Sequence, residues 1–177
     1  MDMNFENRDD VSIDQNLEMI RLKTAVLLGC STKLGAIIAG ADKENQDLIW
    51  DFGINLGLAF QLMDDLLDSF GDEKVFGKRT GGDITSNKKT FLYLKALELA
   101  DDKLKSKLSG LYSRSDENDK IEKVLTLYKE LKIDILTREA MDNYYQMAFS
   151  ALDKINVPES NKQELRKFTK GLMKRVK

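Results

Sequence analysis

The chain has 177 residues, and its 28 Lys and Arg side chains nearly balance its 30 Asp and Glu side chains, which gives a formal net charge of −2. This length suits one ordinary domain with a hydrophobic core, and the near-neutral charge argues against binding to nucleic acid. The sequence contains no His and a single Cys. It therefore excludes His-dependent triads, His-ligated zinc and a disulfide framework within the chain, and leaves carboxylates, Lys, Ser and Thr as reactive groups.

The sequence indicates neither a membrane span nor a secretion signal. The longest apolar stretch, residues 34–41, is far shorter than the roughly 20 residues that cross a bilayer. Residues 1–10 are acidic and polar, whereas a signal peptide needs a basic start and an apolar core. We expect a single cytoplasmic domain that covers residues 1–177.

Apolar residues recur at spacings of three and four, and Pro158 is the only proline, so the sequence predicts an all-α fold. The first predicted helix covers residues 12–40, with Ser12 as its N-cap and a bend near Lys23. The second covers residues 43–71 and would be ~40 Å long. The remaining predicted helices cover residues 89–101, 102–111, 117–132, 134–155 and 160–175.

The second predicted helix is apolar on nearly all sides, which is typical of a buried central helix. At about 100° per residue, Asp64, Asp65 and Asp68 nevertheless fall within a stripe about 100° wide. Three like charges at this spacing repel one another unless a multivalent cation or several donors neutralise them. Because oxygen is the only type of ligand in the stripe, the sequence favours Mg²⁺, which usually shares its shell with water and substrate phosphates.

The same stripe continues toward the N-terminus of the helix through Gly57 and Gly53, which we interpret as an apolar wall for the hydrocarbon part of a substrate. Lys23 and Thr24, polar residues of the first helix, are candidates for a further contact with its charged part. One alternative remains open here. The aspartates could instead lie on the exposed last third of the helix, where acids oppose the helix dipole.

Residues 72–89 follow the second helix and are predicted to form a long loop rich in Gly and Lys. Loops of this length in a compact domain are often functional. Lysines and glycine-freed backbone amides can hold a diphosphate, although each lysine could equally be an ordinary solvated charge. The segment lacks the spacing of a P-loop. Its basic residues are Lys74, Lys78, Arg79, Lys88 and Lys89.

Three segments, LEMIRLKTAVLLGCSTKLGAIIAG, LGLAFQLMDDLLDSFGD and GKRTGGDITSNKKT, occur in this order and spacing. The chain resembles the C-terminal half of trans-isoprenyl diphosphate synthases, the polyprenyl synthetase family. FQLMDDLLD resembles the second aspartate-rich motif of that family. The resemblance is specific over about residues 3–89 and weaker toward the end of the chain.

The resemblance implies an isoprenoid-synthase helical bundle and a transferase that joins isopentenyl diphosphate to an allylic diphosphate with the help of Mg²⁺. By matching positions, Asp64, Asp65 and Asp68 would bind Mg²⁺. The expected diphosphate contacts are Lys23, Thr24, Gln61, Lys78 and Lys88, the first four also as catalytic residues. Family analogy further implies a homodimer, whereas Asp83 and Thr90 receive no role beyond their place in the loop.

The sequence also departs from the family pattern. A first aspartate-rich motif, an arginine pair and the residues that hold isopentenyl diphosphate are not found, and Asp9, Asp10 and Asp14 lack the spacing to replace that motif. We therefore expect the C-terminal portion of the bundle, with half an active site and no activity in isolation. Two alternatives are a non-catalytic helical subunit that pairs with a complete synthase, and an interaction module whose basic residues 161–177 form the binding face.

Overall fold

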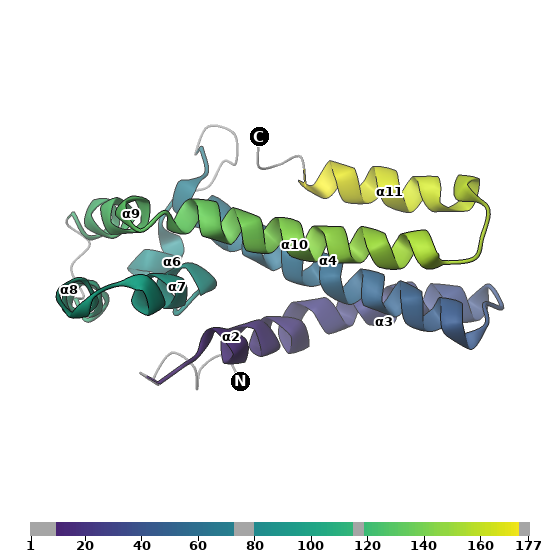
Figure 1. Ribbon diagram of the computed structural model, residues 1–177, viewed down its shortest axis with the longest axis horizontal. Helices are drawn as coiled ribbons and strands as arrows, with labels where there is room; N and C mark the ends of the chain where they lie inside the picture. Colours follow the sequence, from purple (N-terminus) through teal and green to yellow (C-terminus); the bar gives the residue numbers. More distant parts are fainter. Residues whose placement is uncertain (1–9, 73–79, 115–118, 174–177) are drawn as a thin grey trace. The chain divides into compact units, whose positions relative to one another are not determined.

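The computed structural model describes residues 10–72, 80–114 and 119–173, which are helical over most of their length and contain no strand (Figure 1). The predicted all-α fold is therefore confirmed. The helices begin and end close to the residues that the sequence predicts, since side-chain caps define several of their N-termini.

The first helical region begins as predicted at Ser12, whose Oγ accepts a hydrogen bond from the backbone N–H of Gln15 at 3.2 Å. The Gln15 side chain accepts one in return from the Ser12 N–H at 3.2 Å, so the two residues form a capping box. The region comprises α2 (Ile13–Ile20), a π-helical segment η1 (Arg21–Ala25) and α3 (Val26–Ile38). The structure thus has a π-helix at Lys23, where the sequence predicts a bend.

Helix α4 (Lys43–Phe70) is the long second helix that the sequence predicts. Its N-terminus is capped by Asp42, which accepts a hydrogen bond from the Asn45 N–H at 2.8 Å. The predicted loop that follows is partly wrong, because a short helix, α6 (Gly82–Thr85), forms within residues 72–89. A segment of four residues is too short to show a helical period in the sequence.

The remaining helices lie within about three residues of their predicted bounds. Asp101 caps α8 by accepting a hydrogen bond from the Leu104 N–H at 2.8 Å. These helices are α7 (Phe91–Leu99), α8 (Asp102–Tyr112), α9 (Lys120–Glu130), α10 (Ile133–Lys154) and α11 (Glu159–Met173).

The chain packs as two compact units. Of the described residues, unit 1 contains 10–19, 64–72, 80–114 and 119–139, and unit 2 contains 20–63 and 140–173. Helices α4 and α10 each contribute residues to both units. The single domain expected from the sequence stays a prediction.

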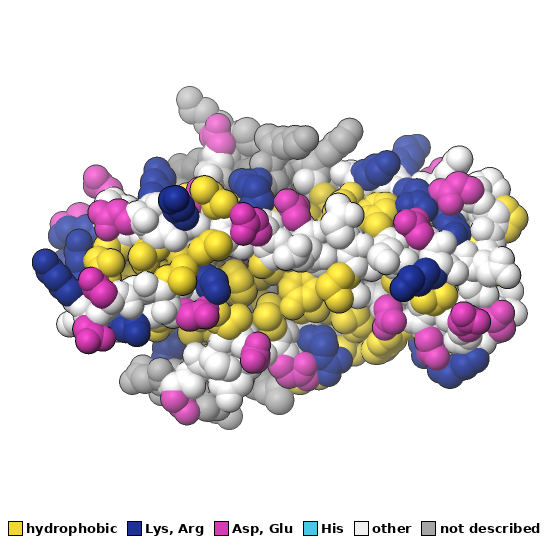
Figure 2. All heavy atoms as spheres, in the orientation of Figure 1, with side chains coloured by type: hydrophobic (Ala, Val, Ile, Leu, Met, Phe, Trp, Pro, Cys, Tyr) yellow, Lys and Arg dark blue, Asp and Glu magenta, His cyan; other side chains and the backbone are white. Residues whose placement is uncertain are grey.

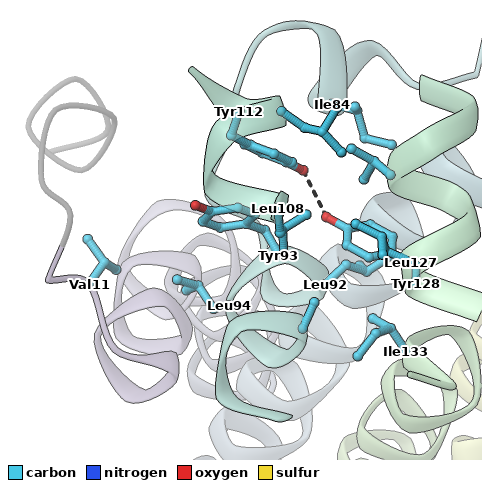
Figure 3. Packing of buried hydrophobic residues seen from close by; sticks show 13 residues of the cluster. Val11, Ile84, Leu92, Tyr93, Leu94, Leu108, Tyr112, Leu127, Tyr128 and Ile133 are labelled. Carbon is cyan, nitrogen blue, oxygen red and sulfur yellow. Dashed lines mark hydrogen bonds between the residues drawn. The ribbon is translucent and has the colours of Figure 1, made fainter. Parts of the chain in front are cut away.

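Unit 1 has its own hydrophobic core, drawn in Figure 3. Leu92 of α7, Leu108 of α8 and Leu127 of α9 are almost fully buried in it. The hydroxyl groups of Tyr112 and Tyr128 meet within this core at 2.8 Å, and Figure 3 shows them pointing toward each other. Burial raises the pKa of both tyrosines, so both stay protonated.

Unit 2 has a second core that joins α4, α10 and α11. Phe52 and Leu56 of α4 pack with Leu152 of α10, and Leu165 of α11 packs against this cluster. Helices α10 and α11 lie side by side (Figure 1), and the Lys162 ammonium donates a hydrogen bond to the Asp153 carbonyl at 2.9 Å. The polar contact and the shared apolar cluster fix α11 on α10.

Unit 2 also exposes large apolar side chains. On α3, Leu27 is 68% exposed, Leu34 is 58% exposed and Ile38 is 79% exposed. Figure 2 shows hydrophobic side chains reaching the surface between charged ones on the face drawn there. Despite this apolar surface, no helix among the described residues is long and apolar enough to cross a membrane.

Candidate active site

The three predicted metal ligands lie at the C-terminal end of α4, in unit 1, and have three different environments. Asp64 is exposed, Asp65 is only 6% exposed and Asp68 is intermediate. The open alternative of a fully exposed acidic helix end therefore fits Asp64 but not Asp65. Burial of a carboxylate is costly unless other groups compensate for it, and such groups surround Asp68.

Asp68 is the point at which α4 holds the start of α6. Its Oδ2 accepts a hydrogen bond from the Asp83 backbone N–H at 2.9 Å, and its carbonyl oxygen accepts one from the Gly81 N–H at 2.6 Å. Gly81 has a φ of +82°, a conformation that glycine adopts at little cost, and it stands directly before α6. The turn at Gly81 thus brings residues 81–83 back onto Asp68.

Asp83 in turn holds Lys88, one of the predicted diphosphate contacts. The Lys88 ammonium donates a hydrogen bond to Asp83 Oδ1 at 2.5 Å. This contact raises the pKa of Lys88, and the negative charges of Asp68 and Asp65 raise that pKa further. Lys88 therefore lies within the electrostatic field of the aspartates.

The pKa of Asp68 is raised, chiefly because burial disfavours its charged form. The hydrogen bond from the Asp83 N–H and the charge of Lys88 oppose this shift, while the charges of Asp83 and Asp64 add to it. The charged form of Asp68 is therefore disfavoured mainly by burial and further by two neighbouring carboxylates. A bound cation would favour the charged form.

The residues fit Mg²⁺ in donor chemistry, but they do not form a finished metal centre. Within residues 10–72, 80–114 and 119–173 no group of three or more acidic side chains is arranged to hold a metal ion. The nearby donors are all carboxylate oxygens, and Mg²⁺ commonly uses one or two carboxylates and completes its shell with water and substrate phosphates. An exposed Asp64 and a half-buried Asp68 are compatible with that mode of binding.

Unit 2 brings together two other predicted contacts, Thr24 and Gln61. The Thr24 hydroxyl donates a hydrogen bond to the Gln61 side-chain oxygen at 3.2 Å. Thr24 and Lys23 both belong to the π-helix η1, and Lys23 is exposed there. Single π-helical turns within α-helices are frequent at functional sites, a signal that apolar periodicity does not show.

The glycines of α4 explain why η1 and α3 approach that helix so closely. A Cβ on Gly57 would lie 2.5 Å from the Ala25 Cα, and a Cβ on Gly53 would lie 2.7 Å from the Gly29 Cα. The interpretation of these glycines as part of an apolar wall applies to Gly53, which lines an apolar cavity in unit 2, and not to Gly57. Both are buried because they let a second helix pack against α4.

An apolar cavity of about 300 Å³ lies between helices of unit 2. Leu27 is one turn beyond Thr24 along the chain, and Leu56 is five residues before Gln61, so the cavity begins about 5–8 Å along each helix from the Thr24–Gln61 contact. Its lining comes from α3, α4 and α11. The residues are Leu27, Leu28, Ser31, Thr32, Phe52, Gly53, Leu56, Leu165 and Phe168.

The structure brings together some of the predicted site residues, whose roles stay predictions. Lys88 joins the aspartates, and Thr24 joins Gln61, whereas Lys78 lies outside the described residues. Asp83, which the sequence analysis left without a role, connects Asp68 to Lys88. The pair of glycines directly before it is the sequence signal that could have indicated a tight turn at this point.

Known proteins resemble the chain over most of its length. The polyprenyl synthetase family model matches residues 1–131. Geranylgeranyl diphosphate synthase of Sulfolobus acidocaldarius is 37% identical over 174 residues, which cover 96% of this chain and 52% of that protein. A crystal structure of a geranylgeranyl pyrophosphate synthase is 43% identical, with a TM-score of 0.91 over 99% of this chain and 55% of the other.

A further relative is informative for its ligands. A geranylgeranyl pyrophosphate synthase from Corynebacterium glutamicum, solved with isoprenyl diphosphate and magnesium, is 25% identical, with a TM-score of 0.88 over 98% of this chain and 50% of the other. The chain spans about half the length of these relatives. The structural likeness confirms the predicted isoprenoid-synthase fold, and the chain belongs to the polyprenyl synthetase family.

Proposed function

We propose that this chain provides the allylic-diphosphate half of a Mg²⁺-dependent prenyl diphosphate synthase. The observation that carries the proposal is the series Asp68, Asp83 and Lys88, in which Asp83 donates its backbone N–H to the half-buried Asp68 carboxylate and accepts the Lys88 ammonium with its own carboxylate. A diphosphate that carries Mg²⁺ needs oxygen ligands for the metal and donors for its own oxygens. The end of α4 and the residues that follow α6 offer both, brought together by Asp83.

The proposal assigns a role to each predicted contact. Asp64, Asp65 and Asp68 would hold Mg²⁺, which when bound supplies positive charge for the diphosphate as it leaves. The diphosphate oxygens would receive hydrogen bonds from Lys88 and Lys78. A lysine ammonium has three N–H donors, so Lys88 can keep its bond to Asp83 and still donate to a phosphate oxygen. Lys23, Thr24 and Gln61, which belong to unit 2, stay predicted contacts of the diphosphate.

The proposed reaction breaks the allylic C–O bond, and the bonding electrons leave with the diphosphate. The double bond of isopentenyl diphosphate then attacks the allylic cation, and a proton is lost from the product. The apolar cavity of unit 2, lined in part by Leu27, Phe52 and Leu56, has the chemistry to contact a hydrocarbon chain. Isopentenyl diphosphate is the second substrate that the family resemblance implies, and this chain, which covers about half the length of its relatives, is assigned no contact with it.

Binding of the diphosphate can be tested on the chain itself. We expect geranyl diphosphate with Mg²⁺ to stabilise the folded chain by ~2.7 kcal/mol at 100 times its Kd. The stabilisation should require both ligands together, because the metal links the diphosphate to the aspartates. Urea unfolding of the 177-residue chain, with and without each ligand, measures this directly.

Two variants on the same helix make the test specific. Asp64→Asn removes an exposed carboxylate of the aspartate stripe and should abolish most of the ligand-dependent stabilisation. Asp51→Asn removes an exposed carboxylate on an earlier part of α4 and should leave it intact. The proposal would be contradicted if the ligands still stabilised the Asp64→Asn and Asp68→Asn variants. It would also be contradicted if the wild-type chain folded cooperatively but the ligands did not stabilise it.

The exposed apolar side chains of α3 favour a second candidate, a helical subunit that pairs with a complete synthase. Leu27, Leu34 and Ile38 are each more than half exposed, and such a surface often marks an interface. Charged residues in place of Leu34 and Ile38 should then abolish association, as measured by sedimentation velocity, without changing the ligand-dependent stabilisation. Homodimer formation and a cytoplasmic location stay predictions.

A further inference from the structure

A buried lysine outside the proposed diphosphate contacts holds the residue that precedes Lys88. Lys120, the first residue of α9, is only 1% exposed. Its ammonium donates a hydrogen bond to Asn87 Oδ1 at 2.6 Å, lies 3.4 Å from the Arg114 carbonyl oxygen, and lies 5.6 Å from the centre of the Tyr112 ring. A buried ammonium is costly unless polar groups surround it, so this arrangement ties Asn87 firmly to α9.

Asn87 needs such support because its backbone has an unusual conformation. Its φ is +54°, in the left-handed region that few residues other than Gly and Asn adopt readily. The Asn87 N–H bonds to the Ile84 carbonyl at 3.1 Å, and the Lys88 N–H bonds to the Asp83 carbonyl at 2.9 Å. These two bonds form a Schellman motif at the end of α6, with Asn87 in the left-handed position and Lys88 next to it.

The residue that follows Lys88 is held in a similar way. Asn16 of α2 is 1% exposed, and its side-chain N–H donates a hydrogen bond to the Lys89 carbonyl at 3.1 Å. Both neighbours of Lys88 are therefore held by buried polar side chains from distant parts of the sequence. Lys88 itself is exposed, with its ammonium on Asp83.

We propose that Lys120 is a positioning residue, which holds Asn87 in the left-handed conformation so that the Lys88 ammonium stands beside Asp83 and Asp68 before a ligand arrives. The proposal rests on the proposed function, since it takes Lys88 to be a diphosphate contact. A lysine that is already ordered loses less conformational entropy when it binds. Lys120 would then raise affinity for a diphosphate without touching it.

The first measurement does not depend on any ligand. Lys120→Met removes the ammonium and keeps an unbranched apolar side chain, whereas Lys103→Met changes an exposed lysine of α8 and serves as the control. We expect the Lys88 amide hydrogen, which bonds to the Asp83 carbonyl, to exchange with solvent at least about threefold faster in Lys120→Met. The control should leave its exchange unchanged.

The second measurement is a double-mutant cycle in binding of geranyl diphosphate with Mg²⁺. Lys120→Met should weaken binding roughly 2- to 10-fold, the range expected when one long side chain must be ordered on binding. In a Lys88→Ala background the same substitution should have no further effect, because Lys120 acts through Lys88. A merely structural role would weaken binding equally in both backgrounds, and that result would overturn the proposal.

Asn87→Gly keeps the test decisive if Lys120→Met does not fold. Glycine adopts the left-handed conformation freely but offers no side-chain oxygen to Lys120. Faster exchange of the Lys88 amide in this variant supports the proposal, and unchanged exchange overturns it. If Lys88→Ala weakens binding while Lys120→Met and Asn87→Gly do not, only the positioning role is wrong. If Asp64→Asn leaves binding intact, the proposed function itself is wrong.

Discussion

In unit 2, Thr24 meets Gln61 because glycines let η1 and α3 lie directly on α4, whereas in unit 1 Lys88 reaches the aspartates through a series of polar contacts. The first arrangement depends on shape, and a single methyl group in the wrong place disrupts it. The second depends on charge and hydrogen bonding, so it responds to pH and to the loss of a polar atom. Unit 2 should therefore be sensitive to added side-chain volume, and unit 1 to pH and to the loss of a hydrogen-bonding atom.

Gly57→Ala should have the largest effect. The added Cβ would lie 2.5 Å from the Ala25 Cα, and such overpacking typically costs about 1–3 kcal/mol of unfolding free energy. The cost should not change between pH 5 and 8, because no titratable group takes part. Urea unfolding at both pH values measures it.

Gly35→Ala is the matched control on α3, where an added Cβ meets nothing within 4 Å. Alanine favours a helix over glycine, so this variant should be more stable than the wild type by up to about 1 kcal/mol. A Gly57→Ala chain as stable as Gly35→Ala would mean that the close contact of η1 with α4 is not needed. The claim that unit 2 depends on close helix packing would then be wrong.

Tyr128→Phe tests whether unit 1 depends on a buried hydrogen bond. It leaves the buried Tyr112 hydroxyl without the partner that lies at 2.8 Å, which should cost about 1–3 kcal/mol. Tyr145→Phe, at a half-buried position of α10, should stay within about 0.5 kcal/mol of the wild type. Thermal unfolding of both variants makes the comparison, and equal stabilities would show that the Tyr112–Tyr128 contact contributes nothing.

Asp101→Ala measures how much a single exposed hydrogen bond contributes to the stability of unit 1. Loss of the N-cap of α8 should cost about 1 kcal/mol, because the Leu104 N–H loses its acceptor. Ser106→Ala, at an exposed position within the same helix, should not destabilise the chain. If both variants match the wild type in urea unfolding, the first turn of α8 frays without loss of stability.

Asp68→Asn should have the smallest effect on stability, and its effect should depend on pH. Burial raises the pKa of Asp68 above that of the unfolded chain, so the folded chain binds more protons in the acidic range and loses stability as pH rises through it. The Asn side chain at position 68 cannot ionise, so it removes this loss of stability at higher pH. Its oxygen can still accept the hydrogen bond from the Asp83 N–H. The variant should therefore gain stability relative to the wild type as pH rises from about 3.5 to 7.

Urea unfolding across that range measures the difference, with Asp51→Asn as the control on the same helix. A constant difference between Asp68→Asn and the wild type would contradict the raised pKa of Asp68. The expected gain in stability at neutral pH, with loss of ligand binding, is typical of a charged group that is kept for function.

Much of the fold could be predicted because helices depend on local sequence. Ser12, Asp42 and Asp101 each cap a helix within three residues of their own position, and apolar spacing of three and four defines the buried sides. The same local rule places Asp64 and Asp68 one turn apart on α4. The motifs around them are also local, so family membership could be inferred from the sequence.

Tertiary structure decided which of these local features meet. Asp68 and Asp83 are 15 residues apart, and Lys120 and Asn87 are 33 residues apart, so no helical period connects them. The role of Gly57 was likewise decided by the residue opposite it, Ala25, and not by its own neighbours in the sequence. The sequence by itself determined the helices and the chemistry that they carry, because both depend on near neighbours. Only the packing of distant segments decided how that chemistry is held in place.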